Sequence, residues 1–261
     1  KKLYFSNSPY QKIQILDSHQ FKKMLILDGI VQATEVDEFI YHEMMVHVPV
    51  FSHSNPQKIL IIGGGDGGIL REILRHPVKE VVMVEIDKKV IEVCQKFLPT
   101  LNNGVFEDKR VKILIDDGIK FVANCQEKFD IVIVDSSDPV GPAEGLFTLD
   151  FYQNVKKVLT IDGLAVFQSG SSFLQAEETA DILKRNKQVF PFVNIYVFAV
   201  PVYHGGFFAL TLASKKINPF KISSKKIEEK FKARQIETKY YNPQIHFASF
   251  ILPNYIKNYL K

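Results

Sequence analysis

Residues 58–68 read KILIIGGGDGG, an apolar run that leads into a glycine-rich turn. The following stretch, Gly68–Arg75, has the apolar spacing of a helix. In this strand–turn–helix context, Gly63, Gly65 and Gly68 satisfy the G-x-G-x-x-G fingerprint, whose glycines permit a tight turn and the close approach of a ligand. Glu85 ends the next predicted strand, where a carboxylate can accept both hydroxyls of a ribose. The stretch predicts a nucleotide or nucleoside site.

Asp66 narrows the choice of nucleotide. In a dinucleotide enzyme the pyrophosphate lies at the N-terminus of this helix, and a carboxylate among the glycines would repel it. A ligand with a sulfonium and an amine, such as S-adenosylmethionine or a relative, fits a carboxylate better. Asp66 could instead only cap the helix, and that alternative stays open.

The rest of the chain after residue 58 alternates between predicted strands and helices, which is typical of a parallel, doubly wound sheet. The last two strands are separated only by a turn and predict an antiparallel hairpin at one end. Seven strands of this kind resemble the Rossmann-like fold of S-adenosylmethionine-dependent methyltransferases. The predicted strands are Lys58–Ile62, Glu80–Val84, Val111–Ile115, Phe129–Val134, Leu164–Gln168, Asn194–Val200 and Phe207–Ala213.

The first fifty residues have a different pattern. Apolar runs at Lys12–Leu16, Phe21–Leu27 and Ile30–Thr34 predict a small antiparallel sheet, with Asp28-Gly29 as a hairpin turn. No strand is predicted before Lys12, and a helix is predicted from Asp37 to Pro49. A sheet this small needs a partner surface. We therefore expect an N-terminal oligomerisation domain at residues 1–50 and a catalytic domain at residues 51–261.

Composition excludes several classes of protein. The chain has 46% hydrophobic and 24% charged residues and a net charge of +4, which is too small and dispersed to favour nucleic-acid binding. The apolar stretch Ile195–Ala213 is interrupted by Pro201 and predicts two strands rather than a membrane span. Cys94 and Cys125 make no disulfide framework, so we expect a cytoplasmic protein. The tail from Ser223 predicts one polar helix and a packed C-terminal segment.

Carboxylates also follow the third and fourth strands of the large sheet. Asp116-Asp117-Gly118 could contact an adenine or cap a helix, and both readings stay open. Asp135 ends the fourth strand, so its side chain should face the ligand crevice at the carboxyl edge of the sheet. The connection to Phe147 contains two prolines and two glycines and is predicted to be a loop that closes over a substrate.

Five separated motifs resemble the polyamine aminopropyltransferases and cover nearly the whole chain. The motifs are LDGIVQ with DEFIYHE (27–43), GGGDG (63–67), VEID (84–87), DDG (116–118) with residues 135–147, and YYNP (240–243) with His246. The resemblance implies that Gln11, Gly63, Gly65, Glu85, Asp117, Gly118 and Pro142 bind the nucleoside. It further implies that the polyamine or aminopropyl chain contacts Gln32, Tyr41, His42, Asp66, Asp135, Ser136, Ser137, Asp138, Gln168 and Tyr203.

The implied reaction is transfer of the aminopropyl group of decarboxylated S-adenosylmethionine to putrescine, giving spermidine and methylthioadenosine, with Asp135 as proton acceptor. Decarboxylated S-adenosylmethionine is a co-substrate, and no prosthetic group or metal is implied. His42 and His47 are spaced i, i+5, whereas the zinc motif H-E-x-x-H needs i, i+4. The family assembles into dimers or tetramers through its N-terminal sheets. The alternatives are an N-methyltransferase of a small polyamine and a non-catalytic polyamine- or nucleoside-binding module.

The acidic residues also predict discrimination between nucleosides. Ordinary S-adenosylmethionine carries a carboxylate at the end that would face Asp66, and Asp135 and Asp138 are expected nearby. No Arg or Lys occurs in residues 63–70 or 135–150. A carboxylate would therefore lie beside like charges without a partner, and the site should favour the decarboxylated nucleoside.

Overall fold

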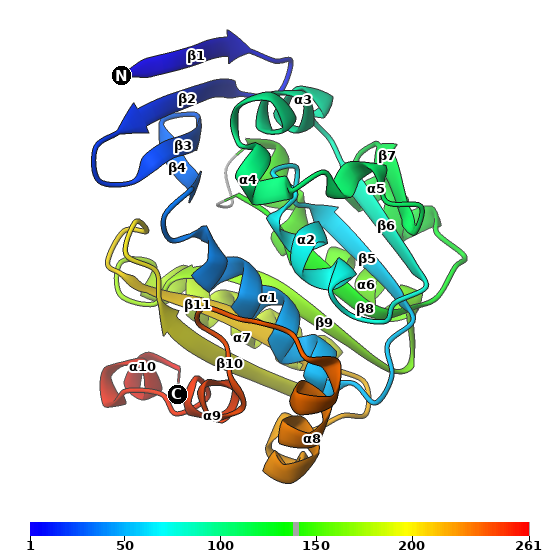
Figure 1. Ribbon diagram of the computed structural model, residues 1–261. Helices are drawn as coiled ribbons and strands as arrows, with labels where there is room; N and C mark the ends of the chain where they lie inside the picture. Colours follow the sequence, from blue (N-terminus) through cyan, green and yellow to red (C-terminus); the bar gives the residue numbers. More distant parts are fainter. Residues whose placement is uncertain (138–140, 261) are drawn as a thin grey trace.

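The small N-terminal sheet has four antiparallel strands in the order β1-β2-β3-β4. The computed structural model describes residues 1–137 and 141–260, with the side chains of all of these except Gly141 and Pro142. The strands of the small sheet are β1 Lys2–Asn7, β2 Lys12–Ser18, β3 Lys22–Leu27 and β4 Ile30–Thr34. Asp28 and Gly29 both have positive φ, 50° and 88°, as the predicted hairpin turn requires. Strand β1 is not predicted from the sequence and forms the exposed edge of this sheet (Figure 1).

The large sheet has seven strands in the order β10-β11-β9-β8-β5-β6-β7. The run from β9 to β7 is parallel, and β11 is antiparallel to both of its neighbours, so the predicted doubly wound sheet with a terminal hairpin is confirmed. Its strands are β5 Lys58–Gly63, β6 Glu80–Glu85, β7 Val111–Ile115, β8 Phe129–Asp135, β9 Leu159–Ser171, β10 Phe192–Ala199 and β11 Phe207–Ser214.

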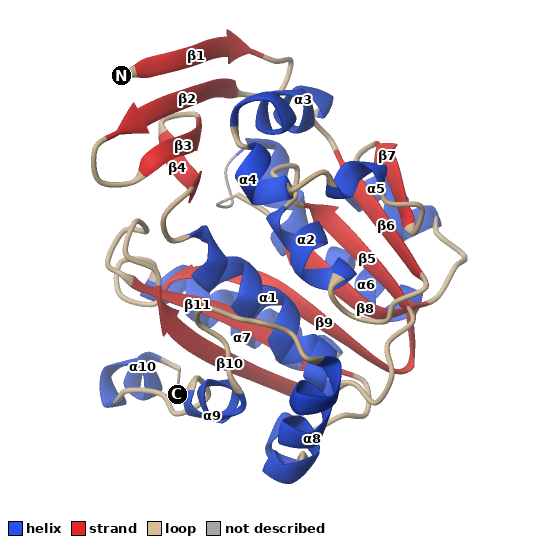
Figure 2. Ribbon diagram, in the orientation of Figure 1, coloured by secondary structure: helices blue, strands red, loops and turns tan. Residues whose placement is uncertain are grey.

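Helices cover both faces of the large sheet (Figure 2). Because successive strand residues point to opposite faces, Ile59 and Ile61 pack with α1 and α2, while Leu60 and Ile62 pack with α5 and α6. The α-helices are α1 Glu38–Ser52, α2 Gly68–Leu74, α3 Lys88–Phe97, α4 Pro99–Asn102, α5 Gly118–Asn124, α6 Leu149–Val158, α7 Ala176–Val189, α8 Ser224–Arg234, α9 Pro243–Ala248 and α10 Asn254–Tyr259. Short 3-10 turns occur at Val105–Glu107, Gly141–Phe147 and Pro219–Lys221.

The C-terminal tail contains the predicted polar helix, α8, and a segment with two further short helices, α9 and α10. This segment is tied to α1 by Glu43, a buried carboxylate that accepts the backbone N–H groups of Lys239, Tyr240 and Tyr241 at 2.7–2.8 Å. The segment therefore helps to hold α1 against the large sheet. Within residues 1–137 and 141–260, no helix has the length and hydrophobicity needed to cross a bilayer.

The parallel strands place their carboxyl ends along one edge. Gly63 of β5 pairs with Asp135 of β8, and Glu85 of β6 pairs with Ile115 of β7. The small sheet is joined to this edge by hydrogen bonds from Ser8 and Gln11, which flank the β1–β2 turn, to Asp87. The two sheets thus enclose the edge where the motif residues gather.

Candidate active site

A cavity of about 240 Å³ lies at this edge. Its lining comes from the glycine loop, the ends of β6, β8 and β9, α1, the small sheet and the loop between β10 and β11. The predicted site residues that line it are Gln11, Gln32, Tyr41, His42, Gly63, Gly65, Asp66, Glu85, Asp117, Gly118, Asp135, Ser136, Ser137, Gln168 and Tyr203. Asp138 and the side chain of Pro142 lie outside the described part of the chain.

The glycine loop lets the backbone approach its neighbours closely. Gly63 has φ of 85°, and a Cβ added there would lie 2.0 Å from the backbone oxygen of Asp135. A Cβ on Gly65 would lie 2.9 Å from a carboxylate oxygen of Glu85. Any larger residue at these two positions would therefore push apart the strands or the carboxylate that border the cavity.

Glu85 lies at the end of β6, where it is buried and accepts the backbone N–H of Asp87 at 2.9 Å. Burial, together with the charges of Asp87 and Asp135, raises its pKa to about 7. Gln11 lies close by and donates to the carboxylate of Asp87 at 3.0 Å. This end of the cavity offers acceptors that suit a hydroxylated ring.

Asp117 caps a helix, as one of the two predictions for it states, while its contact with an adenine stays a prediction. Its carboxylate caps α5 by accepting the N–H of Ile119 at 2.9 Å, and the residue also lines the cavity. A Cβ on Gly118 would lie 2.4 Å from the side chain of Ile62, so only glycine fits there without displacement of β5.

Asp135 is bound by a tyrosine from α1. The hydroxyl of Tyr41 donates to its carboxylate at 2.6 Å. Burial and the nearby charge of Asp66 raise the pKa of Asp135 to about 6, although the Tyr41 hydrogen bond and the His42 charge act in the opposite direction. The rings of Tyr203 and Phe208 pack against Tyr41, and the Tyr203 hydroxyl donates to the backbone oxygen of Gln32 at 2.7 Å. Asp135 therefore lies behind an aromatic cluster, and its pKa is closer to neutrality than that of an ordinary aspartate.

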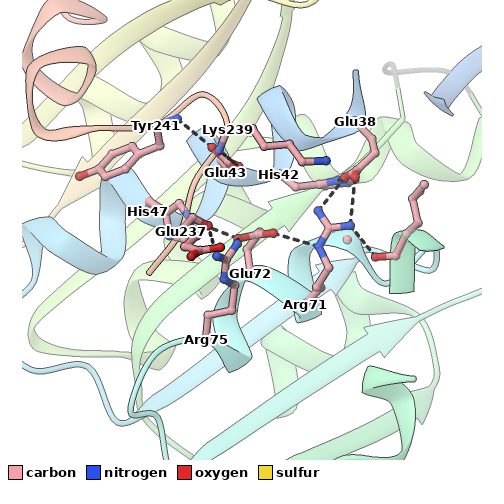
Figure 3. A network of polar contacts seen from close by, with 12 residues as sticks. Glu38, His42, Glu43, His47, Arg71, Glu72, Arg75, Glu237, Lys239 and Tyr241 are labelled. Carbon is pink, nitrogen blue, oxygen red and sulfur yellow. Dashed lines mark hydrogen bonds and ion pairs between the residues drawn. The ribbon is translucent and has the colours of Figure 1, made fainter. Parts of the chain in front are cut away.

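Asp66 is paired with His42, which also contacts Glu38 on α1. Figure 3 shows His42 with Glu38 and Arg71. His42 Nε2 lies 3.3 Å from the Asp66 carboxylate, and His42 Nδ1 lies 2.5 Å from Glu38. Burial lowers the pKa of His42, but the two carboxylates outweigh burial and raise it to about 10. His42 is therefore an imidazolium at neutral pH, and Asp66 also caps α2 by accepting the Gly68 N–H at 2.8 Å.

This pairing corrects the expected charge of the site. The sequence has no Arg or Lys in residues 63–70 around Asp66, but the structure places the His42 cation beside Asp66. Arg71, the next residue after that stretch, pairs with Glu38 on the other side of His42. Arg71 donates to both carboxylate oxygens of Glu38, at 3.0 and 2.8 Å. Sequence reasoning missed Glu38 and Arg71 as members of the site, although the i, i+4 spacing of Glu38 and His42 is a readable signal.

Several further cavity residues were missed because they come from loops or the far sheet. Gln175 accepts the N–H of Ser171 at 2.8 Å, and both line the cavity together with the exposed His204. Ser136 has a buried hydroxyl without a hydrogen-bond partner within the described residues, which suits contact with a ligand. The same part of the chain contains no cluster of three or more His, Cys, Asp or Glu residues that could hold a metal ion.

Known proteins share this arrangement. The family profile described as spermine/spermidine synthase domain matches residues 38–225, and the spermidine synthase tetramerisation domain matches residues 1–35. The chain belongs to the polyamine aminopropyltransferases. It is 46% identical to the polyamine aminopropyltransferase of Thermoanaerobacter sp. (strain X514), over 98% of this chain and 90% of that protein. It is 45% identical to that of Caldicellulosiruptor saccharolyticus, over 100% of this chain and 92% of that protein.

Solved aminopropyltransferase structures have the same fold. A spermidine synthase in complex with the transition state analogue AdoDATO matches with a TM-score of 0.95 and 40% identity, covering 100% of this chain and 88% of that one. The spermidine synthase from Thermotoga maritima matches with a TM-score of 0.93 and 39% identity, over 100% and 87% of the two chains. The predicted resemblance to aminopropyltransferases is confirmed, and the alternative of an N-methyltransferase is not supported.

Proposed function

We propose that this aminopropyltransferase transfers the aminopropyl group of decarboxylated S-adenosylmethionine to putrescine, giving spermidine and methylthioadenosine. One observation carries the proposal: two carboxylates, Asp66 in the loop after β5 and Asp135 at the end of the neighbouring strand β8, line the same cavity as Glu85. A cavity that has an acceptor for ribose hydroxyls at one end and two carboxylates for amines at the other suits a cationic nucleoside and a diamine together.

In the proposed reaction, the lone pair of a neutral putrescine amine attacks the methylene carbon of the aminopropyl group that is bonded directly to the sulfonium sulfur. The carbon–sulfur bond breaks, and its electron pair stays on sulfur, which becomes the neutral thioether of methylthioadenosine. The attacking nitrogen becomes a secondary ammonium, which loses one proton to Asp135 and leaves the neutral secondary amine of spermidine. The sulfonium is a good leaving group, so most of the catalysis lies in alignment and in the supply of a neutral amine.

The environment of Asp135 favours its role as the proton acceptor. Moving a proton from an amine of pKa about 10.4 to an ordinary aspartate costs about 9 kcal/mol. With the pKa of Asp135 raised to about 6, the difference is about 4.4 pKa units, which corresponds to about 6 kcal/mol. The raised pKa thus removes about a third of the cost.

The proposed binding roles follow the two ends of the cavity. Glu85 accepts the ribose hydroxyls, while Gln11, Gly63, Gly65, Asp117, Gly118 and Pro142 contact the rest of the nucleoside. Asp66 and His42 face the ammonium of the aminopropyl chain. The proposed wall of the acceptor site is Gln32, Tyr41, Ser136, Ser137, Asp138, Gln168 and Tyr203, with Asp135 at the reacting amine.

We also propose that the protein forms a homodimer or homotetramer through its N-terminal sheet. The match of residues 1–35 to a tetramerisation domain supports this assembly. A cytoplasmic location is proposed as well, since both cysteines are free thiols.

A direct assay tests the proposed function. The protein is incubated with decarboxylated S-adenosylmethionine and, in separate reactions, with putrescine, cadaverine or spermidine, and methylthioadenosine and the amine product are quantified. Putrescine should give the highest rate and spermidine as product. Faster turnover of spermidine or cadaverine would overturn the assignment of the acceptor. A methylated amine formed from ordinary S-adenosylmethionine would overturn the reaction.

A further inference from the structure

The cations at the aminopropyl end of the cavity are few and already paired. Among the described lining residues there is no Lys or Arg, and the cation beside Asp66 is His42. Both ring nitrogens of His42 have a carboxylate partner, Glu38 on one side and Asp66 on the other. An incoming carboxylate therefore finds no free donor on this ring.

Arg71 is the next cation behind His42, and four of its five N–H groups have acceptors. Its two terminal nitrogens donate to Glu38, one of them also donates to the backbone oxygen of Leu101 at 2.6 Å, and its Nε donates to Glu72 at 2.9 Å. Figure 3 shows Glu38 between Arg71 and His42, so one carboxylate occupies both cations at once. Glu38 is buried and does not line the cavity itself.

We propose that Glu38 is a specificity-determining residue that makes the site reject nucleosides with a carboxylate at the end of the transferable chain. The inference rests on the proposed function and names a residue that touches neither substrate. Glu38 lies between His42 and Arg71, and Arg71 also pairs with Glu72. Because both ring nitrogens of His42 and four of the five N–H groups of Arg71 already have partners, the carboxylate of ordinary S-adenosylmethionine would be buried beside Asp66 without a donor from the His42 ring, whereas the ammonium shared by both nucleosides still faces Asp66.

Removal of the Glu38 charge should reduce the preference for the decarboxylated nucleoside. In Glu38→Gln the Nδ1–H of His42 can still donate to an amide oxygen, while Arg71 loses a bidentate carboxylate partner. One negative charge is then removed from between His42 and Arg71. A carboxylate should bind better there, and a donor that carries only an ammonium should bind worse.

The test compares three nucleosides on the wild-type protein and on Glu38→Gln. Dissociation constants are measured by calorimetry for decarboxylated S-adenosylmethionine, ordinary S-adenosylmethionine and methylthioadenosine, with displacement of methylthioadenosine used for weak binding. In Glu38→Gln the preference for the decarboxylated nucleoside should fall at least about tenfold, and methylthioadenosine, which lacks the chain, should bind as before. Glu38→Asp keeps the charge and should keep most of the preference.

Glu43→Gln is the matched control. Glu43 lies on the same helix and is also buried, but its carboxylate faces the backbone of residues 239–241 rather than His42. This variant should keep the nucleoside preference even if its unfolding midpoint falls. Equal weakening of all three nucleosides in Glu38→Gln, or the same loss of preference in Glu43→Gln, would show a structural role and overturn the proposal.

A second variant covers the case in which Glu38→Gln does not fold. Arg71→Gln removes a cation but leaves the carboxylate of Glu38 paired with His42. The preference for the decarboxylated nucleoside should therefore rise. An unchanged or smaller preference would contradict the proposal. Methylthioadenosine formation by the wild-type protein, from decarboxylated S-adenosylmethionine and putrescine, tests the proposed function separately. If the wild-type protein forms no methylthioadenosine but Glu38→Gln still loses the nucleoside preference, the proposed function is wrong and the proposed role of Glu38 in selectivity is supported.

Discussion

Asp135 combines three features at one carboxylate: a position at the end of a parallel strand, a hydrogen bond from Tyr41 at 2.6 Å, and a pKa raised to about 6. We expect Asp135→Asn to lower turnover about 10²- to 10⁴-fold, the usual contribution of a positioned general base. Methylthioadenosine should bind nearly unchanged because its proposed contacts are to Glu85 and Asp117 and it lacks the aminopropyl chain. Steady-state kinetics and calorimetry on the same variant check both statements. A comparable loss of methylthioadenosine affinity would contradict this division of roles.

The raised pKa of Asp135 also predicts the pH dependence of the rate. Only the ionised carboxylate accepts a proton, so kcat/KM, which reports the pKa values of the free protein, should rise as the pH increases through about 6. A larger fraction of neutral amine acts in the same direction at higher pH. The acidic limb should be absent from the residual activity of Asp135→Asn. A wild-type profile that is flat from about pH 5 to about pH 8 would show that this ionisation does not limit turnover.

Glu85 should make nucleoside binding depend on pH. Its pKa of about 7 means that the free protein is partly protonated near neutrality, and the ionised form is the better acceptor for ribose hydroxyls. Methylthioadenosine affinity should therefore rise with pH through about 7, and binding should release protons. Glu85→Gln should bind about ten- to a hundredfold more weakly, which corresponds to the loss of hydrogen bonds to a charged group, without this pH dependence. An unchanged dissociation constant would remove Glu85 from the site.

At the scale of elements, the contact between α1 and α2 aligns His42 with Asp66. Gly68 opens α2, and a Cβ there would lie 2.2 Å from the His42 ring. Gly68→Ala should therefore displace His42, lower the free energy of unfolding by about 1–3 kcal/mol through overpacking, and weaken binding of the decarboxylated nucleoside. Chemical denaturation and calorimetry measure the two effects.

Gly104→Ala is the control for that substitution. Gly104 has φ of 75° and nothing within 4 Å of an added Cβ, so it tests backbone strain without a clash. We expect a cost of about 1 kcal/mol and no change in nucleoside binding. If Gly68→Ala is no more destabilising than Gly104→Ala, the packing of α2 against His42 is looser than the structure indicates.

At the scale of the whole molecule, the small sheet leaves large apolar side chains exposed, among them Phe5 on the edge strand β1, which is 50% exposed. Sedimentation analysis of the 29.9 kDa chain should give a dimer or a tetramer. Phe5→Glu should shift that assembly towards smaller species because it places a charge in an apolar contact. Phe220→Glu, at a position that is 62% exposed on another part of the surface, should not. A monomeric wild-type protein would contradict the proposed assembly.

The division of the chain into residues 1–50 and 51–261 stays a prediction. Helix α1 begins at Glu38 and packs in the same apolar cluster as β5 and β9. This packing favours a boundary before α1, so that Tyr41 and His42 belong to the unit that carries the glycine loop.

Local sequence determined most of the large sheet. The continuous apolar run of β5, the glycine turn and the acid at the end of β6 depend on residues that are neighbours in the chain, so local sequence predicts them. Asp135 was predicted in the same way, because parallel strands end at a common edge. Recognition of separated motifs supplied the remaining site residues that line the cavity, and the roles of Asp138 and Pro142 stay predictions.

Only the tertiary structure decided the charge of the site. Glu38 and Arg71 are separated by 33 residues and meet because α1 and α2 pack side by side, which no local pattern specifies. The edge strand β1 was missed for a similar reason, since its only partner in the small sheet is β2 and its exposed pattern gives a weak signal. Hydrophobic period and turn chemistry act over a few residues, whereas ion pairs between helices depend on packing, and here packing determines which carboxylates are balanced by a cation.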